Sequence, residues 1–449
     1  MSNLKNLTRG NITRQLLELA VPLIICNILQ QLYNTVDAVI VGRYIGAEAF
    51  AAIGVAGTVM NLFIFVIVGG CVGAGIIWAQ YFGSGDLDGF RREGVAALAV
   101  GSFLTLLISA AGLAATGFLL QLIDTPLAIT GMVQQYLEII FAGLMATFLY
   151  NYCSTMLRAV GNTAMALIFL AAAIVLNLVL DVLFIAGFGW GIQGAAVATV
   201  IAQSVGTVLC YLYMRRHTPQ LLFTRSDLEV DKQLWLCTFR YSVVAAMHNS
   251  NLYIGKLLVQ GAVNGSGVDM VAAYTATSRL EGFANSLGDS GTAALNIFIA
   301  QNVGGGQRQR VRRGFFTGLV LLLALGAASS ALMYAGAAAG IGFMLGGGAS
   351  VEAFNQGVAY MQIISCFYIL CFTGNALVGY FEGHGRLVIP IIGATGHIAL
   401  RAALSYMYIG EAGLSAVAYA TGIGWFGVVC FWSWLCYKQM KRESCAAVN

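Results

Sequence analysis

Charged side chains are scarce in this chain of 449 residues. They make up 9% of it, whereas hydrophobic residues make up 59% and the mean hydropathy is +0.80. A soluble domain carries roughly 25% charged residues, so this chain has too few to cover a surface in contact with water. Its apolar runs last about 20 residues, too long for the ten-residue alternating segments of a membrane barrel. The composition therefore predicts an all-α polytopic membrane protein.

Several motifs of other protein classes are also missing. No basic cluster with interleaved aromatic residues accompanies the net charge of +4, so we expect no nucleic-acid partner. Most of the ten cysteines lie inside apolar runs and no CxxC pair occurs, which argues against disulfides and metal clusters. The Gly304–Gly306 triplet lacks the Lys-Ser/Thr of a phosphate loop. His248 and Ser250, two positions apart, point in different directions on a helix, so we expect no enzyme and no cofactor beyond a transported ion.

The chain contains an internal repeat. Ala79-Gln80, followed by Gly83 and by two arginines, recurs at an offset of 221 as Ala300-Gln301, followed by Gly304 and by two arginines. An offset of 224 aligns further pairs in the same two halves. A duplicated membrane unit is typical of a transporter whose substrate site lies at the interface of the repeats.

Hydropathy predicts twelve transmembrane helices in two pseudo-symmetric six-helix lobes. Residues 1–214 form the first lobe, residues 215–233 a cytoplasmic linker, and residues 234–449 the second lobe. Lys and Arg gather in the loops on one side, with Arg43 as the exception on the other side. The positive-inside rule then places both termini in the cytoplasm. We expect a monomeric multi-pass protein of the inner, cytoplasmic membrane.

A polar face follows the first span. Asn27, Gln30, Asn34 and Asp37 are spaced by three, four and three positions, which puts them on one side of a helix, with Tyr33 four positions before Asp37. A polar face on a membrane helix must meet protein or water. We therefore expect the two asparagines and the glutamine to line the substrate cavity.

The acid of the first span has candidate partners in spans five and six. Asn177 and Asp181 lie four positions apart on one face, and Thr199 lies in the following span. An acid at mid-membrane costs about 2.5–3.5 kcal/mol, so two acids in one lobe need a reason. Their oxygens could coordinate Na⁺ or bind protons. The remaining alternative is that both acids only fix the register of packed helices.

The second lobe lacks these acids. Arg401 and Ser405 match Asn177 and Asp181 at the offset of 224. We assign Asn151 of span four, Lys256 of span seven and Arg401 to the substrate cavity. These cations either form ion pairs with nearby acids or make a basic wall that suits an anionic group of the substrate. The nearby acids belong to span eight and are Glu281 and Asp289.

These motifs together resemble the multidrug and toxic compound extrusion (MATE) family over essentially the whole chain. The similarity rests on the twelve spans, on Asn34-Thr35-Val36-Asp37, on Ala79-Gln80 with Gly83, and on Asn177 with Asp181 followed by residues 194–199. It implies an antiporter that exports organic compounds in exchange for H⁺ or Na⁺ by alternating access. In the branch with a cation site in the first lobe, the family's cation residues match Asp37, Asn177, Asp181 and Thr199, with Tyr33 as a neighbour.

A related function remains as an alternative, namely a flippase for a lipid-linked saccharide or another anionic amphiphile. The basic groups Lys256 and Arg401 would suit its pyrophosphate. In either case the expected partners are a small organic substrate and the lipid bilayer.

Overall fold

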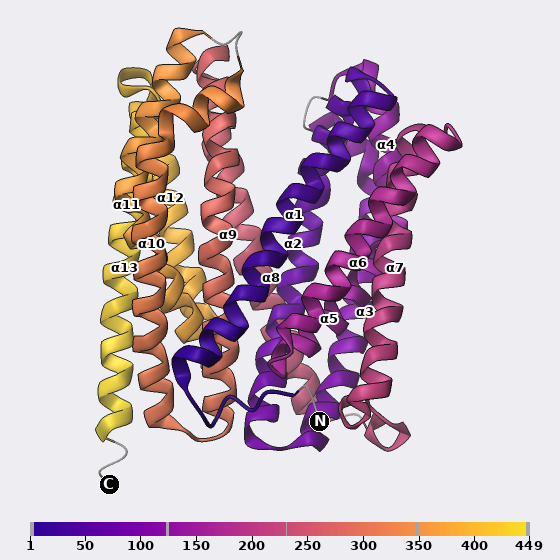
Figure 1. Cartoon of the computed structure of the whole chain (residues 1–449), viewed down its shortest axis with the longest axis vertical. Helices are drawn as coiled ribbons and strands as arrows, with labels where there is room; N and C mark the ends of the chain where they lie inside the picture. Colours follow the sequence, from indigo (N-terminus) through magenta and orange to yellow (C-terminus); the bar gives the residue numbers. More distant parts are fainter. Residues whose placement is uncertain (1–3, 123–124, 230, 347–349, 446–449) are drawn as a thin grey trace. The chain divides into compact units, whose positions relative to one another are not determined.

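The computed structural model describes residues 4–122, 125–229, 231–346 and 350–445, and within them the regular secondary structure is helical, without a strand (Figure 1). The first half of the chain contains α1 (Ile12–Tyr44), α2 (Ala47–Ser84), α3 (Leu87–Leu122), α4 (Leu127–Ala142), α5 (Leu144–Ala159), α6 (Thr163–Asp181) with the π-helical turn η1 (Val182–Gly187), and α7 (Gly191–His217). Two short 3-10 turns follow, η2 (Pro219–Leu221) and η3 (Arg225–Leu228). The second half contains α8 (Lys232–Asn264), α9 (Val268–Gly304), α10 (Arg308–Leu345), α11 (Val351–Gly383), α12 (Val388–Ala412) and α13 (Leu414–Cys445).

The twelve predicted spans are confirmed. Helices α4 and α5 form one span that is bent by 49°, and with it the described residues provide twelve helical spans in two sets of six. Nine of the helices and the bent pair are long and apolar enough to cross a membrane by themselves. Helices α8 and α9 do not meet this criterion, and both carry charged residues within their length, among them Lys256, Glu281 and Asp289.

The bend between α4 and α5 occurs at Gly143. A Cβ atom at this position would lie 2.2 Å from Cγ2 of Val200 in α7, a distance that real side chains do not reach. Glycine therefore lets α7 approach the backbone at the bend.

Contacts within the chain divide it into two compact units. Unit 1 comprises Met1–Leu7 and Ile25–Met247, and unit 2 comprises Thr8–Ile24 and His248–Asn449. Compared with the lobes drawn from the sequence, the first part of α1 belongs to unit 2 and the first part of α8 to unit 1. The internal boundaries at Ile25 and His248 are separated by nearly the repeat offset, so the division occurs at equivalent places in the two halves.

Within unit 1, α2 packs against α3, α4 and α5, and α6 packs against α7. The first part of α8 approaches α2 closely enough to exclude side chains. A Cβ atom on Gly69 would lie 2.6 Å from Cα of Ala246, and one on Gly73 would lie 2.5 Å from the carbonyl oxygen of Tyr241. The Ser242 hydroxyl donates a hydrogen bond to the Gly70 carbonyl at 3.0 Å. Small residues that allow such backbone contact are typical of helix pairs in membranes.

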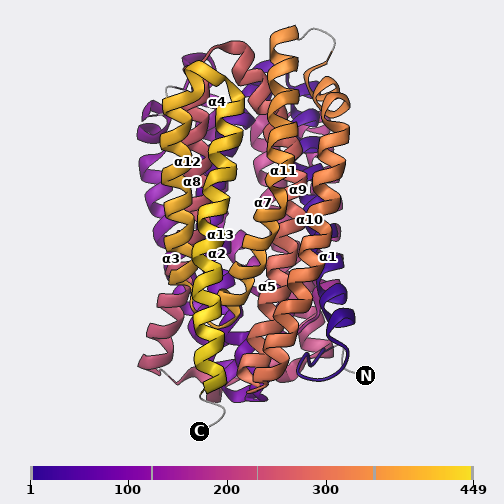
Figure 2. The same ribbon diagram turned by 90° about the vertical axis from the view of Figure 1, so that its left-hand side faces the viewer.

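Within unit 2, α11 packs against α9, α10 and α13, and Figure 2 shows these helices running side by side. The pair of α9 and α11 also relies on glycine. A Cβ atom on Gly379 would lie 2.9 Å from the carbonyl oxygen of Thr292, and one on Gly383 would lie 2.9 Å from that of Asn296. Close helix packing therefore positions the polar residues that these helices carry.

The backbone repeats between the units where the sequence does. Gly161 has φ of 76° and its counterpart Gly385, at the offset of 224, has φ of 72°. Gly191 and Gly413, at an offset of 222, both have φ of 58°. Left-handed turns at matching positions fix where α6 and α12, and α7 and α13, begin. The repeat found in the sequence therefore holds for the helix boundaries as well.

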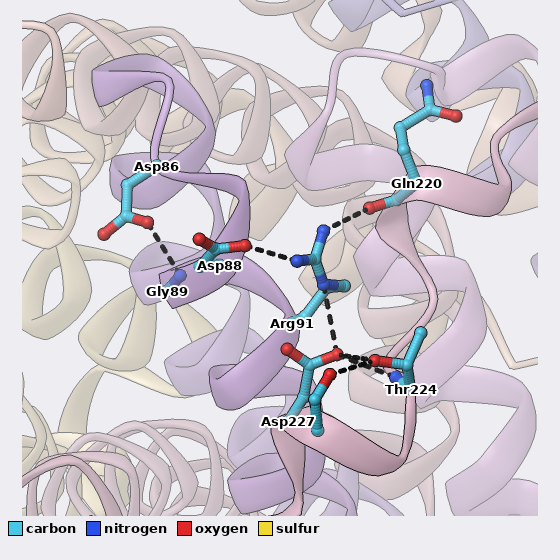
Figure 3. Close-up of polar contacts among 8 residues, drawn as sticks. Asp86, Asp88, Gly89, Arg91, Gln220, Thr224 and Asp227 are labelled. Atoms are coloured by element: carbon cyan, nitrogen blue, oxygen red, sulfur yellow. Dashed lines mark hydrogen bonds and ion pairs between the residues drawn. The ribbon is translucent and has the colours of Figure 1, made fainter.

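The segment between α7 and α8 is tied to the start of α3 (Figure 3). Nε of Arg91 donates to Oδ2 of Asp227 at 3.1 Å, and Nη1 donates to the carbonyl oxygen of Gln220 at 3.4 Å. The same Asp227 oxygen accepts from the backbone N–H and the hydroxyl of Thr224, each at 2.7 Å. A second acid, Asp88, accepts from Nη2 of Arg91. We call these contacts the linker clasp.

The linker clasp changes the titration of Asp227. Burial acts to raise the pKa of its carboxyl group, but the hydrogen bonds from Thr224 and Arg91 outweigh burial and hold this pKa below the ordinary value of 3.8. Because the pKa is lowered in the folded protein, the ionised group stabilises the fold above the ordinary pKa, and this contribution is lost only as pH falls through the lowered one.

Candidate functional site

Helix α1 delivers one acid and one phenol to the interior of unit 1. Asp37 is 7% exposed, and its Oδ1 atom has no hydrogen-bond partner among the described residues. Tyr33 lies one helical turn earlier and is partly buried. Two other residues of the predicted polar face, Gln30 and Asn34, are exposed instead, and Asn27 is partly buried. The polar stripe is therefore divided between an inner part and an outer part.

Helix α6 supplies the second acid. Asn177 is 2% exposed and Asp181, the last residue of α6, is fully buried. The chain continues directly into the π-helical turn η1, which widens the helix just after the carboxyl group. Such turns interrupt regular helix packing and occur frequently at functional sites.

The Asn177 amide connects three helices. With its nitrogen directed toward the acid, it donates to Oδ2 of Asp181 at 2.8 Å and to the Tyr33 hydroxyl at 3.2 Å, and its oxygen accepts from the backbone N–H of Thr199 at 3.1 Å. The Thr199 hydroxyl donates to the carbonyl oxygen of Ala195, one turn earlier in α7, at 3.0 Å. The structure thus brings together Tyr33, Asp37, Asn177, Asp181 and Thr199, which we call the acid-pair site.

The two carboxyl groups of this site face each other. Asp37 and Asp181 are close enough to hydrogen-bond when one of them carries a proton. One oxygen of each, Oδ1, has no donor, and among the described residues no Lys or Arg forms an ion pair with either acid. Buried charges without a partner are strongly unfavourable. The pair must therefore be neutralised by a proton or by a mobile cation.

The donor set is made of oxygen atoms: two carboxylates, an amide, a hydroxyl and a phenol. Hard cations such as Na⁺ prefer these ligands, whereas transition metals prefer sulfur or imidazole. Across the described part of the chain, no group of three His, Cys, Asp or Glu side chains is arranged to hold a metal ion. The oxygen donor set therefore suits a monovalent cation such as Na⁺ or a proton.

Tyr136 of α4 is a further member that the sequence analysis did not assign to the site. It is 3% exposed and lies beside Tyr33, Thr199 and the acids of the pair. It stands between Gln135 and Glu138, and no polar residue recurs at a helical spacing that would point to it as a site residue. The only signal in the sequence was its match to Tyr360 at the repeat offset of 224.

Unit 2 contains a different cluster, centred on Glu281 of α9. The Tyr360 and Tyr368 hydroxyls donate to its two oxygens at 3.1 and 3.4 Å. Arg401 of α12 and Lys256 of α8 are the cations whose charges act on Glu281. Lys256 also attracts Asp289, which like Lys256 is exposed, whereas Arg401 is partly buried. Among the described residues, neither cation forms an ion pair with Glu281 or Asp289, so the ion-pair alternative and the basic wall both stay predictions.

The remaining residue predicted to line the cavity is Asn151 of α5. It is partly buried, and its amide nitrogen donates to the Thr147 carbonyl of its own helix at 2.8 Å. Its assignment to a substrate cavity stays a prediction.

Comparison with known proteins identifies relatives along most of the chain. The family model MatE matches residues 22–183 and 245–407. The probable multidrug resistance protein YpnP of Bacillus subtilis (strain 168) is 30% identical over 305 residues, 68% of each protein. YoeA of the same organism, also a probable multidrug resistance protein, is 26% identical over 334 residues, covering 73% of this chain and 72% of YoeA.

A solved structure has the same fold. It is an outward-facing multidrug resistance transporter of the MATE family within the MOP superfamily, with a TM-score of 0.91, 19% identity, and coverage of 97% of this chain and 98% of the other. At this identity the similarity establishes the arrangement of helices and leaves the chemistry of the site to be argued from the residues themselves.

Proposed function

Because the chain belongs to the MATE family of multi-pass membrane transporters, we propose that it is a secondary active antiporter that exports organic compounds in exchange for H⁺ or Na⁺. Probable multidrug resistance is the role named for the relatives YpnP and YoeA. The observation that supports ion coupling is the acid pair of unit 1, which is buried without a basic counterpart. We place the chain in the branch of the family whose cation site lies in the first lobe.

The proposed mechanism uses the acid-pair site as the switch. A cation or proton that binds to Asp37 and Asp181 removes their charge, so that α1 can rearrange near Pro22 and the substrate is released on the far side. When the ion leaves toward the cytoplasm, the acids regain their charge and the inward-facing state is favoured again. The ion does not need to touch the substrate, because both bias the same helix arrangement.

The energy available from one ion is sufficient for export. One charge that crosses a potential of 100 mV supplies about 2.3 kcal/mol. This corresponds to roughly fifty-fold accumulation of a substrate when coupling is tight.

Orientation follows from the loops. The basic residues gather on one side of the membrane, which supports cytoplasmic termini and insertion in the cytoplasmic membrane. We propose a monomer, since each unit holds its own cluster of polar residues. The relatives do not favour the flippase alternative, which would predict transport of an anionic amphiphile.

The test is transport in proteoliposomes with an imposed gradient of Na⁺ or of H⁺. Wild-type protein should move a fluorescent organic cation against its gradient with one of these ions. Asp37→Asn and Asp181→Asn should each abolish this coupled movement, because an amide can neither release a proton nor balance a cation. Glu138→Gln is the matched control, since Glu138 is an exposed acid of α4 in the same unit.

Undiminished gradient-driven transport by either aspartate variant would overturn the proposal. Wild-type protein that responds to neither ion, but moves an anionic amphiphile, would favour the flippase alternative.

A further inference from the structure

The cluster around Glu281 occupies the place in unit 2 that the acid-pair site occupies in unit 1. Tyr360 is the counterpart of Tyr136 at an offset of 224, and Thr421 is the counterpart of Thr199 at an offset of 222. The flanking left-handed glycines share these two offsets, so the matches follow the backbone and not the sequence alone. Thr421 also donates to the carbonyl oxygen one turn earlier, at 2.7 Å, as Thr199 does.

The side chains in this shared framework differ in charge. Arg401 stands at the position of Asn177, and Ser405 stands at the position of Asp181. Ser405 is fully buried and its hydroxyl oxygen has no hydrogen-bond partner in the described structure. The amide and acid of unit 1 are thus replaced by a guanidinium group and a small hydroxyl.

The acid of unit 2 comes from another helix. Glu281 is 9% exposed and lies on α9, whereas its match on α2, at the offset of 221, is Met60. Its carboxylate accepts hydrogen bonds from two phenols and lies in the field of two cations. Unlike the acid pair, this acid is compensated by groups of the protein itself.

We propose that Arg401 is a built-in cation, which takes in unit 2 the place that the mobile coupling ion takes in unit 1. The guanidinium charge acts on Glu281 and is fixed to α12 at the position that matches Asn177. It keeps unit 2 permanently in the neutralised state that unit 1 reaches only when an ion binds. Unit 2 then contributes no ion of its own to the transport cycle. This inference rests on the proposed function, because it assigns the ion to the acid pair.

Removal of the built-in cation should open a second ion site. Arg401→Asn places in unit 2 the amide that unit 1 carries, and removes from Glu281 the charge of the partly buried Arg401. The oxygens of Glu281, Tyr360, Ser405 and the new amide then resemble the donor set of the acid-pair site. The charged and titratable groups that face Glu281 and remain in the variant are Lys256 of α8, Tyr274 of α9, and Tyr360, Tyr368 and Cys371 of α11.

The experiment measures the ion dependence of thermal stability in purified protein, in NaCl against choline chloride of equal ionic strength, and across a pH series. The background is Asp37→Asn, which removes the response of unit 1. The Asp37→Asn protein should be insensitive to the coupling ion. Addition of Arg401→Asn should restore a rise in Tm of about 3 °C at a hundredfold excess of ion over its Kd.

Two matched variants make the result specific. Arg401→Lys keeps the positive charge and should remain insensitive to ions. Arg401→Asn with Glu281→Gln removes both charges and should lose the new response while retaining the fold. An Asp37→Asn/Arg401→Asn protein that is insensitive to Na⁺ and H⁺, or a response that persists without the Glu281 carboxylate, would overturn the proposal.

The design also covers failure to fold. If the protein with Arg401→Asn cannot be recovered in any ion, whereas the protein that also carries Glu281→Gln can, no mobile cation can replace the guanidinium group and the proposal is wrong. If neither of these two proteins is recovered, the single variant Glu281→Gln is tested instead. It leaves the charge of Arg401 uncompensated, so the Tm of this variant should rise when chloride replaces gluconate. A Tm that does not rise would overturn the proposal. If the ion raises the Tm of wild-type protein and of Asp37→Asn protein equally, the proposed function is contradicted. The effect of Arg401→Asn relative to Arg401→Lys can still be measured in that case.

Discussion

Replacing the threonine of the acid-pair site by valine gives a sharp test of ion binding, because the repeat offers a matched control. Thr199 and Thr421 occupy equivalent positions in α7 and α13, and each hydroxyl donates to the carbonyl oxygen one turn earlier. Valine has nearly the same shape as threonine and carries a methyl group in place of the hydroxyl. Thr199→Val and Thr421→Val therefore cause the same local change in two different electrostatic surroundings.

The expected magnitudes follow from the contacts. In both variants the lost hydrogen bond spans one turn of a helix, so the free energy of unfolding should fall by no more than about 1 kcal/mol. Only Thr199 lies beside the acid pair, where we propose that its oxygen is one of the neutral ligands of the ion. The loss of one neutral ligand costs about 1–1.5 kcal/mol of ion binding, which corresponds to a loss of affinity of roughly five- to twelve-fold.

The assay is the dependence of substrate export on ion concentration in proteoliposomes. Thr199→Val should shift the half-maximal ion concentration upward by this factor and leave the maximal rate largely intact, whereas Thr421→Val should behave as wild type. Equal shifts in the two variants would show a structural effect common to both helices. If Thr199→Val leaves the half-maximal ion concentration unchanged, the Thr199 hydroxyl is not a ligand of the ion.

Two further predictions concern packing and the linker. Gly73→Ala places a methyl group 2.5 Å from the Tyr241 carbonyl oxygen, so it should lower the free energy of unfolding by about 1–3 kcal/mol, measured as a lower Tm. Gly57→Ala on the same helix, where a Cβ atom would have no neighbour within 4 Å, should be neutral or slightly stabilising. Equal effects of the two variants would contradict the close approach of α8 to α2. Asp227→Asn should open the linker clasp and speed tryptic cleavage at Arg225. In wild-type protein the clasp should resist trypsin equally at all pH values where trypsin acts, because the ionised Asp227 is lost only below the ordinary pKa of 3.8; cleavage that varies with pH in wild type but not in Asp227→Asn would refute this reasoning.

The sequence predicted the number and order of the spans well, because lipid requires long apolar helices with few charges. It did not predict the bend at Gly143. That bend depends on the approach of Val200 from a helix much later in the chain, which no local pattern reports. Helix boundaries at the repeat positions were accessible, since glycines that require a left-handed backbone recur at fixed offsets.

The composition of the site was predicted only in part. The 3.6-residue period identified the polar face of α1, but it could not say which part of that face meets α6 and α7. Asp37 and Tyr33 turn inward, whereas Gln30 and Asn34 are exposed. Tyr136 was missed, because the polar neighbours of this phenol, Gln134, Gln135 and Glu138, are exposed and only packing brings the phenol to the site.

Under the proposed function, the contrast between the two units gives a duplicated protein one ion site to which export is coupled. A repeat with two identical acid pairs would bind ions in both lobes, and each lobe would have to be neutralised before the transporter could rearrange. Here the backbone is shared, as the matching glycine turns and threonine hydrogen bonds show. The charges are not shared by the two units, because Arg401 stands in unit 2 where unit 1 has the amide of Asn177, and the acid Glu281 lies on α9. We therefore propose that substitutions within a shared framework make one unit responsive to ions and the other independent of them.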